Sequence, residues 1–331
     1  MQISTASFYN RSASQMSKLT SDLDRINTEL STQKRLNVAS KDSTAWMMLG
    51  GIKKEEADST AFRANITLSR GLLAQSDTAL DNVGDRLVRV RELATRAGSE
   101  TLNFKDRTAI ATELGQIREG LLVMANARDV RGHPVFGGTG DSAFTKDPTT
   151  QAISYTGNES VATVRIGEAS EMQVGIDGRR VFGGDATMTG VVDVFKLIDD
   201  LTAAMQMPLT ANDPPAPVDP AVDPTTIPPF DEAAARTKYT KSISDALTRL
   251  DSAEGQVSSA RAANGARAAR LEIESTQLDA IGLDREEARS ALEDTDWPTT
   301  MVEFQKTMTI LNATQASVAK LAGLSLFNYL K

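Results

Sequence analysis

The hydrophobic positions near the two ends of the chain follow the same helical period. Close to the N-terminus, large apolar residues stand three and four positions apart, which places them on one stripe of a helix; these are Met16, Leu19, Leu23, Ile26 and Leu30. Close to the C-terminus, alternating steps of four and three run through Trp297, Met301, Phe304, Met308, Leu311, Gln315, Val318 and Ala322. A helix whose apolar stripe faces water is marginally stable. We therefore expect each terminal helix to need a partner, and the other terminus is the nearest candidate.

The segment after the first stripe predicts a break followed by a helical hairpin. Residues 30–42 are polar and contain several side chains that can cap a helix, namely Asn37, Ser40 and Asp42. A short helical piece is predicted to end at the Gly50–Gly51 pair. Apolar residues three and four apart then predict one helix over residues 52–98 and an antiparallel neighbour that begins near Asp106.

The period changes from helical to alternating in the middle of the chain. Alternation between residues 153 and 182, with turns at Gly157 and Gly178, predicts strands and hairpins. Residues 191–206 then predict one amphipathic helix. Residues 208–229 hold most of the prolines of the chain, which favour an extended linker.

The helical period returns near Asp231 and continues to the end, with an interruption at residues 294–298 where Asp294 and Asp296 are expected to cap the last helix. The fold class is therefore mainly α with a β-rich insertion, in which helices from both ends enclose helices further in. We expect three domains, namely a terminal coiled coil (1–40 with 297–331), a helical bundle (41–138 with 231–296) and a β-rich middle domain (139–230).

Composition narrows the possible partners. The formal net charge of -8 and the lack of a basic block argue against a nucleic-acid partner. The absence of cysteine excludes disulfides and thiolate metal sites. No apolar run is long enough for membrane insertion, and the first residues do not resemble a cleaved signal peptide.

Candidate chemistry is sparse. His133 is the only histidine of the chain, so a zinc site has no second histidine or cysteine, and an exposed or structural role is favoured. The glycines between Gly137 and Gly140 lack the Lys-Ser/Thr pair of a phosphate-binding loop and are interpreted as turn residues. We expect no cofactor, no metal and no enzymatic activity.

Several short segments carry a resemblance to a known family. They are Ile3–Thr5, Leu30–Asn37 with Ser40 and Asp42, Val135–Thr139, Val257–Glu272 and the ending Leu324–Leu330. Together they resemble the bacterial flagellin superfamily, and the Ser-Leu-Phe ending is more typical of its junction proteins than of filament flagellin. The chain departs from the family pattern at Gln33, where glycine is common, and at Lys41, where an acidic residue is common.

The resemblance implies a structural subunit of the bacterial flagellum. Such a subunit joins hook-associated protein 1 to the flagellin filament, forms a ring with copies of itself, and is exported unfolded through the flagellar type III apparatus with the help of an export chaperone. The assembly interface is then expected at the two ends of the chain, at Met16, Leu19, Leu23, Ile26, Leu30, Trp297, Met301, Phe304, Met308, Leu311, Val318, Leu324 and Phe327.

Three alternatives stay open at this stage. A minor flagellin would form the filament itself, an enzyme would hold its site between the helices and the insertion, and a coiled-coil binding module would stay with a cytoplasmic partner. On pattern alone, apolar helical stripes are more often intramolecular core than an assembly surface.

The energetics of the ends favour assembly. Burying about ten apolar side chains at ~1.5 to 3 kcal/mol each does not offset ~1 to 2 kcal/mol of ordering cost per residue over roughly seventy residues. We therefore hypothesise that the ends are largely disordered in the monomer and fold on assembly.

Overall fold

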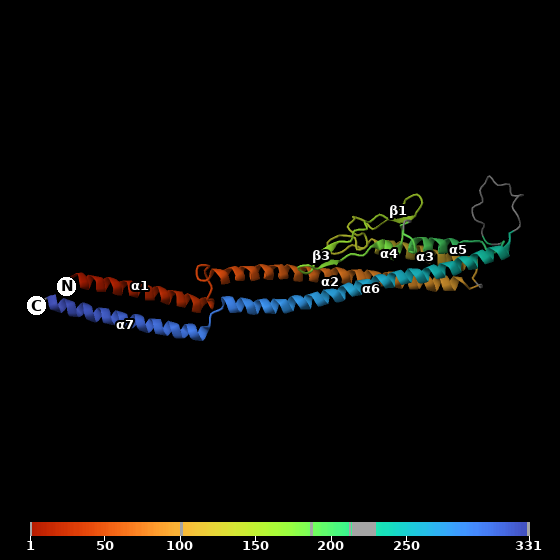
Figure 1. Cartoon of the computed structure of the whole chain (residues 1–331). Coiled ribbons are helices and arrows are strands. Elements are labelled where there is room, and N and C mark those ends of the chain that lie inside the picture. The colour runs from red at the N-terminus through yellow and green to blue at the C-terminus, as the bar shows by residue number, and fades with distance from the viewer. Residues whose placement is uncertain (1, 100–101, 186–187, 212, 214–229, 330–331) are drawn as a thin grey trace. The chain divides into compact units, whose positions relative to one another are not determined.

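Seven helices and four short strands make up the part of the chain that this computed structural model describes (Figure 1). The description covers residues 2–329 except 100–101, 186–187, 212 and 214–229, and the side chains of residues 1–6 and 321–331 are also outside it. In chain order the elements are α1 (Gln2–Thr32), α2 (Ser43–Ala97), α3 (Phe104–Ala125), β1 (Phe144–Lys146), β2 (Ile153–Tyr155), β3 (Thr163–Arg165), β4 (Glu171–Gln173), α4 (Gly178–Phe182), α5 (Val194–Met205), α6 (Glu232–Glu293) and α7 (Trp297–Tyr329). The expected class, mainly helical with a small β insertion, is confirmed.

The chain divides into two compact units. Unit 1 contains residues 1–60 and 278–331, and unit 2 contains residues 61–277. Unit 1 therefore holds α1, α7, the beginning of α2 and the end of α6, whereas unit 2 holds the other elements. The proline-rich linker expected at residues 208–229 lies outside the described residues, apart from residues 208–211 and 213.

Side-chain caps begin several helices. The Asp42 carboxylate accepts a hydrogen bond from the backbone N of Ala45 at 2.9 Å, which satisfies an amide that α2 cannot pair internally. Asn103 and Asp193 cap α3 and α5 in the same way. The capping role expected for Asp42 is confirmed, and α5 begins at Val194 rather than at 191 because Asp193 is its cap.

Helix α2 continues through Gly50 and Gly51, so the predicted break there is wrong. Each glycine costs roughly 1 kcal/mol relative to alanine in a helix interior. The flanking residues outweigh this cost, because Leu49 is buried in a small cluster of unit 1 against which Leu292 of α6 packs. Packing against α6 thus decides the continuity of the helix.

The insertion contains two separate antiparallel hairpins, β1 with β2 and β3 with β4. Strand β1 was not predicted, and Val181 and Phe182 lie in helix α4 where alternation suggested a strand. The reason is local: Asp177 caps this short helix and accepts a hydrogen bond from the backbone N of Arg179 at 3.0 Å. A short apolar run does not by itself distinguish helix from strand.

Unit 2 has an extensive hydrophobic core, to which α2, α3, α5, α6 and the insertion all contribute. At its centre, the Phe182 ring lies 5.3, 5.4 and 5.9 Å from the rings of three other phenylalanines, namely Phe136, Phe144 and Phe195. All four of these rings are at most 3 % exposed. The contacts are edge-to-face or stacked, the geometries that aromatic pairs prefer.

Polar contacts fix α6 to its neighbours within unit 2. The Asn264 amide, 3 % exposed, donates to the Leu73 carbonyl oxygen at 2.8 Å, and Arg261 forms ion pairs with Asp77 and Asp81 of α2. The segment of α6 that contains Arg261 and Asn264, and that resembles the flagellin superfamily, therefore holds α6 against α2.

Candidate assembly surface

The two terminal helices pack side by side in unit 1 (Figure 1). They run antiparallel, because Arg25 of α1 pairs with Glu303 of α7 while Gln33, just after α1, accepts a hydrogen bond at its carbonyl oxygen from Thr295, just before α7. The two ends of the sequence are thus each other's partner, as the shared period predicted.

The predicted stripe of α1 faces this contact. Ile26 is fully buried, and the other four residues of the stripe, Met16, Leu19, Leu23 and Leu30, are only partly buried. Ser12, one heptad step before Leu19, is also buried. One partner helix therefore covers the stripe incompletely.

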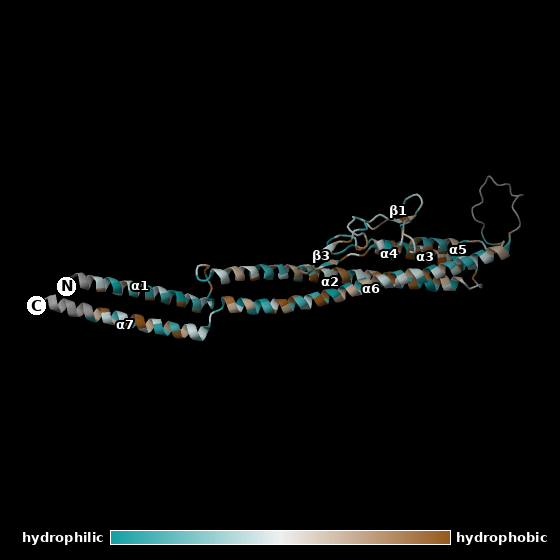
Figure 2. Cartoon of the chain, viewed as in Figure 1, coloured by the Kyte–Doolittle hydropathy of each residue, from teal (hydrophilic) through white to brown (hydrophobic). Residues whose placement is uncertain are grey.

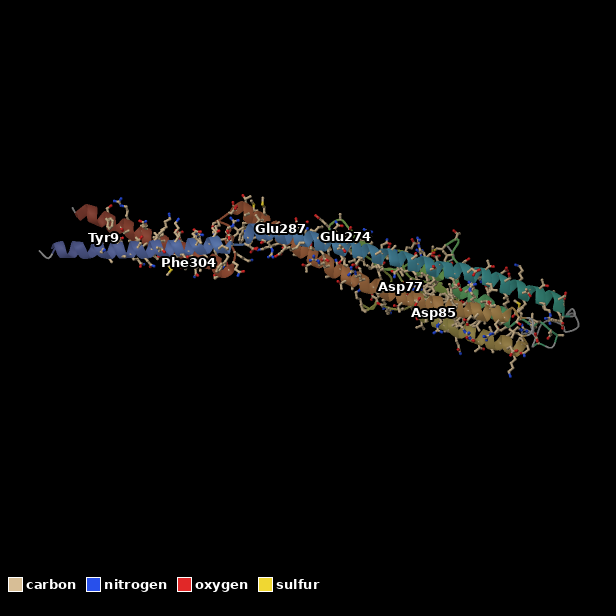
Figure 3. All side chains as sticks on the ribbon, turned by 90° about the horizontal axis from the view of Figure 1, so that it is seen from below. Tyr9, Asp77, Asp85, Glu274, Glu287 and Phe304 are labelled. Atoms are coloured by element: carbon tan, nitrogen blue, oxygen red, sulfur yellow. The ribbon has the colours of Figure 1, made fainter. Side chains whose placement is uncertain are left out.

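The least exposed face of α7 shares Phe304, Leu311 and Val318 with the predicted stripe but otherwise differs from it, and Thr300 is its one buried residue while the others are partly buried. It has regular heptad spacing in which a threonine alternates with an apolar residue: Thr300, Phe304, Thr307, Leu311, Thr314 and Val318. Figure 3 labels Phe304 on this helix. In the sequence, this face could have been recognised by threonines that recur every seven residues. A search for large apolar residues alone misses them. The threonines reduce the apolar area that the contact can bury, which weakens the pair.

Several apolar side chains of α7 remain exposed. Trp297 and Met308, both expected on the stripe, are 51 % and 47 % exposed. Val302 and Ile310 are 66 % and 40 % exposed, whereas Met301 is partly buried. In Figure 2, α7 carries more hydrophobic positions than α1. Leu324 and Phe327 lie in α7, but their side chains are outside the described residues.

Two short segments join the terminal pair to α2 and α6 within unit 1, one between α1 and α2 and the other between α6 and α7. We call residues 33–42 together with residues 293–296 the joint. The backbone N of Arg35 donates to the Glu293 carbonyl oxygen at 2.7 Å, and the backbone N of Thr295 donates to the Gln33 carbonyl oxygen at 3.0 Å. Gln33 has a φ of 58°, the left-handed region that glycine adopts without strain. This explains in physical terms why glycine suits the position.

Two buried carboxylates stabilise the joint. Glu29 is 5 % exposed and accepts hydrogen bonds from Arg25, at 2.8 Å, and from Lys41. Glu293 is 3 % exposed and pairs with Lys34. Burial acts to raise the pKa of Glu29, but the hydrogen bonds from Lys41 and Arg25 outweigh it, so the pKa lies below its usual value.

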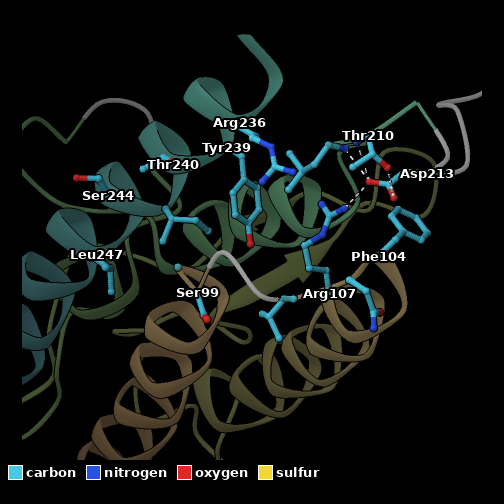
Figure 4. A pocket seen from close by; sticks show the side chains of 15 residues that line it. Ser99, Phe104, Arg107, Thr210, Asp213, Arg236, Tyr239, Thr240, Ser244 and Leu247 are labelled. Atoms are coloured by element: carbon cyan, nitrogen blue, oxygen red, sulfur yellow. Dashed lines mark hydrogen bonds and ion pairs between the residues drawn. The ribbon is translucent and has the colours of Figure 1, made fainter. Parts of the chain in front are cut away.

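A cavity of about 450 Å³ lies in unit 2 beside Arg107 (Figure 4). This guanidinium is 2 % exposed, pairs with Asp213 at 2.8 Å and donates to the Met207 carbonyl oxygen at 2.6 Å. It also lies 5.6 Å from the centre of the Tyr239 ring. Because its charge is paired within the unit, Arg107 fastens the segment after α5 onto α3.

The features considered for chemistry in the sequence have structural surroundings. His133 is exposed, as expected, and its carbonyl oxygen accepts a hydrogen bond from the backbone N of Asp129 at 2.7 Å. Gly138 has a φ of 62°, and a Cβ there would meet the Asn158 carbonyl oxygen at 2.2 Å. Glycine is therefore required by this turn. Among the described residues, no helix is long and apolar enough to cross a bilayer.

Comparison with known proteins agrees with this geometry. Residues 3–141 match the profile of the bacterial flagellin N-terminal helical region, and residues 247–330 match that of the bacterial flagellin C-terminal helical region. The chain is similar to flagellar hook-associated protein 3 of Salmonella typhimurium, 24 % identical over 340 residues that cover 99 % of both chains. It is equally similar to flagellar hook-associated protein 3 of Escherichia coli, 24 % identical over 355 residues that cover 100 % of both chains.

A solved structure shares the fold. A putative flagellar hook-associated protein from Vibrio parahaemolyticus superposes with a TM-score of 0.62 at 21 % identity, covering 77 % of this chain and 100 % of the other. The matched profiles include both terminal helices, which make up the candidate assembly surface, and also α2 and α3. The chain therefore belongs to the bacterial flagellin family and is a structural protein of the flagellum, of the hook-associated protein 3 type.

Proposed function

We propose that this chain is the adaptor that joins hook-associated protein 1 to the flagellin filament. Copies of the chain form a ring, in which the terminal helices supply the contacts between neighbouring subunits. One axial face of the ring accepts hook-associated protein 1, and the other accepts flagellin.

The incomplete burial of the terminal pair carries this proposal. Ile26 is the one residue of the expected α1 stripe that is fully covered, and the α7 face is half threonine. Trp297, Val302 and Met308 expose apolar surface outside the pair. Apolar area of this kind is typical of helices that are completed by further subunits.

In this proposal, each of the three domains expected from the sequence has its own role. Residues 1–40 with 297–331 form the inner tube, residues 41–138 with 231–296 form a surrounding bundle, and residues 139–230 form an outward-facing domain. The ends are disordered in the monomer and fold when neighbours complete them. An export chaperone covers the C-terminal helix until the chain leaves the cell through the flagellar type III apparatus.

Electron microscopy of a strain that lacks this gene tests the proposal, with flagellin assayed in the culture medium. Bare hooks and unpolymerised flagellin in the medium are expected, because the filament then has no template. Filaments of near-normal length would overturn the adaptor function, and would favour a minor flagellin.

A matched pair of variants links this result to the terminal helices. Restoring the gene with Leu311→Asp should leave the hooks bare, because the carboxylate enters the buried face of α7. Restoring it with Asn312→Asp, one residue further along on an exposed position, should restore filaments. Equal rescue by both variants would exclude the terminal pair as the assembly element.

A further inference from the structure

The beginning of α2 is apolar on every side, although only one side is covered. Leu49 and Ala45 are 2 % and 5 % exposed and form a small cluster against which Leu292 of α6 packs. Met47 and Met48 are 70 % and 56 % exposed. A helix that is apolar all round is normally buried all round, so this turn lacks a partner within the described part of unit 1.

Helical geometry places Met47 on the side of α2 that faces away from α6. It lies two residues from both Ala45 and Leu49, and two residues rotate a helix by about 200°. Lys54 lies seven residues after Met47, about two turns, and shares this outer side. Lys54 is exposed, and no ion pair to it is found among the described residues. The outer side of α2 therefore combines a methionine with a lysine.

The end of α6 has a corresponding outer side. Arg285 and Arg289 point toward α2, where they pair with Glu55 and Glu56 at 3.0 and 3.4 Å. Leu283 and Glu287 lie on either side of Arg285, two residues away in each direction, and so face away from α2.

Leu283 is 71 % exposed and Glu287 is also exposed (Figure 3). No ion pair to Glu287 is found among the described residues. The charges that remain for a contact between copies are those of Lys54 on the outer side of α2 and Glu287 on the outer side of α6, because Lys34, Lys41 and Lys53 already pair with Glu293 or Glu29 of the same chain. Unit 1 thus has an apolar and basic surface on one helix and an apolar and acidic surface on the opposite side of its partner helix.

We propose that these two surfaces bind each other between copies of this chain, with Met47, Met48 and Lys54 of one copy against Leu283 and Glu287 of the next. The proposal rests on the proposed function, because it names contacts within the ring. The two surfaces differ and lie on opposite sides of the helix pair, so the contact is head-to-tail. Contacts of this kind close into a ring when the rotation between copies permits it.

Engineered cysteines test the contact directly, since the chain has no cysteine of its own. Flagella are isolated from a strain that carries Met47→Cys together with Leu283→Cys, and are oxidised. A ladder of disulfide-linked dimers and larger multimers of this chain is expected. An intramolecular disulfide is excluded because the two positions face opposite sides of the helix pair, beyond the ~7 Å between Cα atoms that a disulfide permits.

The matched control replaces Met47 by a residue of similar exposure elsewhere. Val123→Cys with Leu283→Cys uses a side chain of unit 2 that is 73 % exposed, and should give no ladder. Flagella that assemble normally but give no ladder from the first pair overturn the contact and leave the adaptor function intact. If the unaltered chain, which has no cysteine, is absent from isolated flagella, the proposed adaptor function is wrong.

A charge exchange provides an independent test. Lys54→Glu and Glu287→Lys should each lower the number of filaments per cell by about tenfold, since like charges then meet between copies. The double variant should restore filaments, because every copy again presents opposite charges. Lys238→Glu, an exposed position in unit 2, should have no effect. A double variant as defective as either single variant would contradict the contact.

Discussion

The core of unit 2 and the terminal helix pair of unit 1 obey the same sequence pattern but differ in burial. In unit 2, Leu80, Val83, Leu87 and Val90 recur at steps of three and four and are all 0 % exposed. In the terminal pair, Ile26 alone reaches this burial among the residues of the expected stripe. A hydrophobic period thus predicts which side of a helix will be covered, and does not predict whether one chain suffices to cover it.

The number of partners explains the difference. The unit 2 part of α2 shares its core with α3, α5, α6 and the insertion. In unit 1, the main partner of α1 is α7. Two helices cannot enclose a dry core, and on this ground we propose that the pair depends on other subunits for most of its stability.

The largest expected effect separates assembly from folding. Leu311→Asp should abolish assembly, because an unpaired carboxylate on the face of α7 that packs against α1 costs about 3 kcal/mol and disrupts the terminal pair. The thermal unfolding of unit 2, followed by far-ultraviolet circular dichroism of the purified monomer, should not change. A lowered unfolding temperature of unit 2 would show that the terminal pair and unit 2 are not independent.

A core variant should produce the opposite result. Phe182→Ala removes the ring at the centre of the phenylalanine cluster, and should lower the free energy of unfolding of unit 2 by about 3 to 5 kcal/mol. Denaturant unfolding measures this loss. Val123→Ala, at a side chain that is 73 % exposed, should change the free energy of unfolding by less than about 0.5 kcal/mol. Similar effects from the two variants would contradict the described core.

Acid should weaken the joint. Because the pKa of Glu29 is lowered in the folded chain, folding favours its ionised form. This contribution is present above the ordinary glutamate pKa, about 4.3, and is lost as the pH falls through the lower folded value. Both tryptophans of the chain, Trp46 and Trp297, lie in unit 1, so their fluorescence in the assembled protein, where α1 is folded, reports the loss.

The control for the acid effect is Glu29→Gln. It removes the titrating group and should lower the stability of unit 1 at neutral pH by about 1 to 2 kcal/mol. Its tryptophan signal should then vary less with pH than that of the parent chain. An unchanged acid response in Glu29→Gln would assign the effect to another group.

The smallest expected effect concerns the backbone of the joint. Gln33→Gly should stabilise unit 1 slightly, by at most about 1 kcal/mol, because glycine adopts a positive φ without strain but has more freedom to lose on folding. Gln33→Val should destabilise it by about 1 to 2 kcal/mol, because a β-branched side chain is strained there. Denaturant midpoints of the tryptophan fluorescence compare the two variants, and equal midpoints would contradict the described backbone.

The sequence predicts the helices better than it predicts their contacts. The α1 stripe was found because its large apolar residues also form the buried face. Half of the expected α7 stripe was displaced by one residue, because Thr307 and Thr314 are partly buried whereas Met308 and Gln315 are exposed. Threonine contributes methyl groups to a contact while its hydroxyl is satisfied within its own helix, as Thr314 does with Ile310 at 2.8 Å. Hydrophobicity alone does not identify such positions.

The contacts of the joint could not be predicted from the sequence. Glu29 and Glu293 become buried only because Lys41 and Lys34 arrive from a loop whose path depends on tertiary packing. The same holds for Gly50 and Gly51, where α2 continues because its neighbouring residues pack against α6. Local propensity is a weak guide wherever tertiary contacts contribute more than about 1 kcal/mol per residue.

Hydrogen exchange of the same residues in the monomer and in isolated flagella tests the central claim most directly. The amides of residues 7–30 and 300–320 should exchange rapidly in the monomer and slowly after assembly, whereas those of residues 80–97 in unit 2 should exchange slowly in both states. Slow exchange of residues 7–30 and 300–320 in the monomer would contradict the account, because the terminal pair would then be stable without its neighbours.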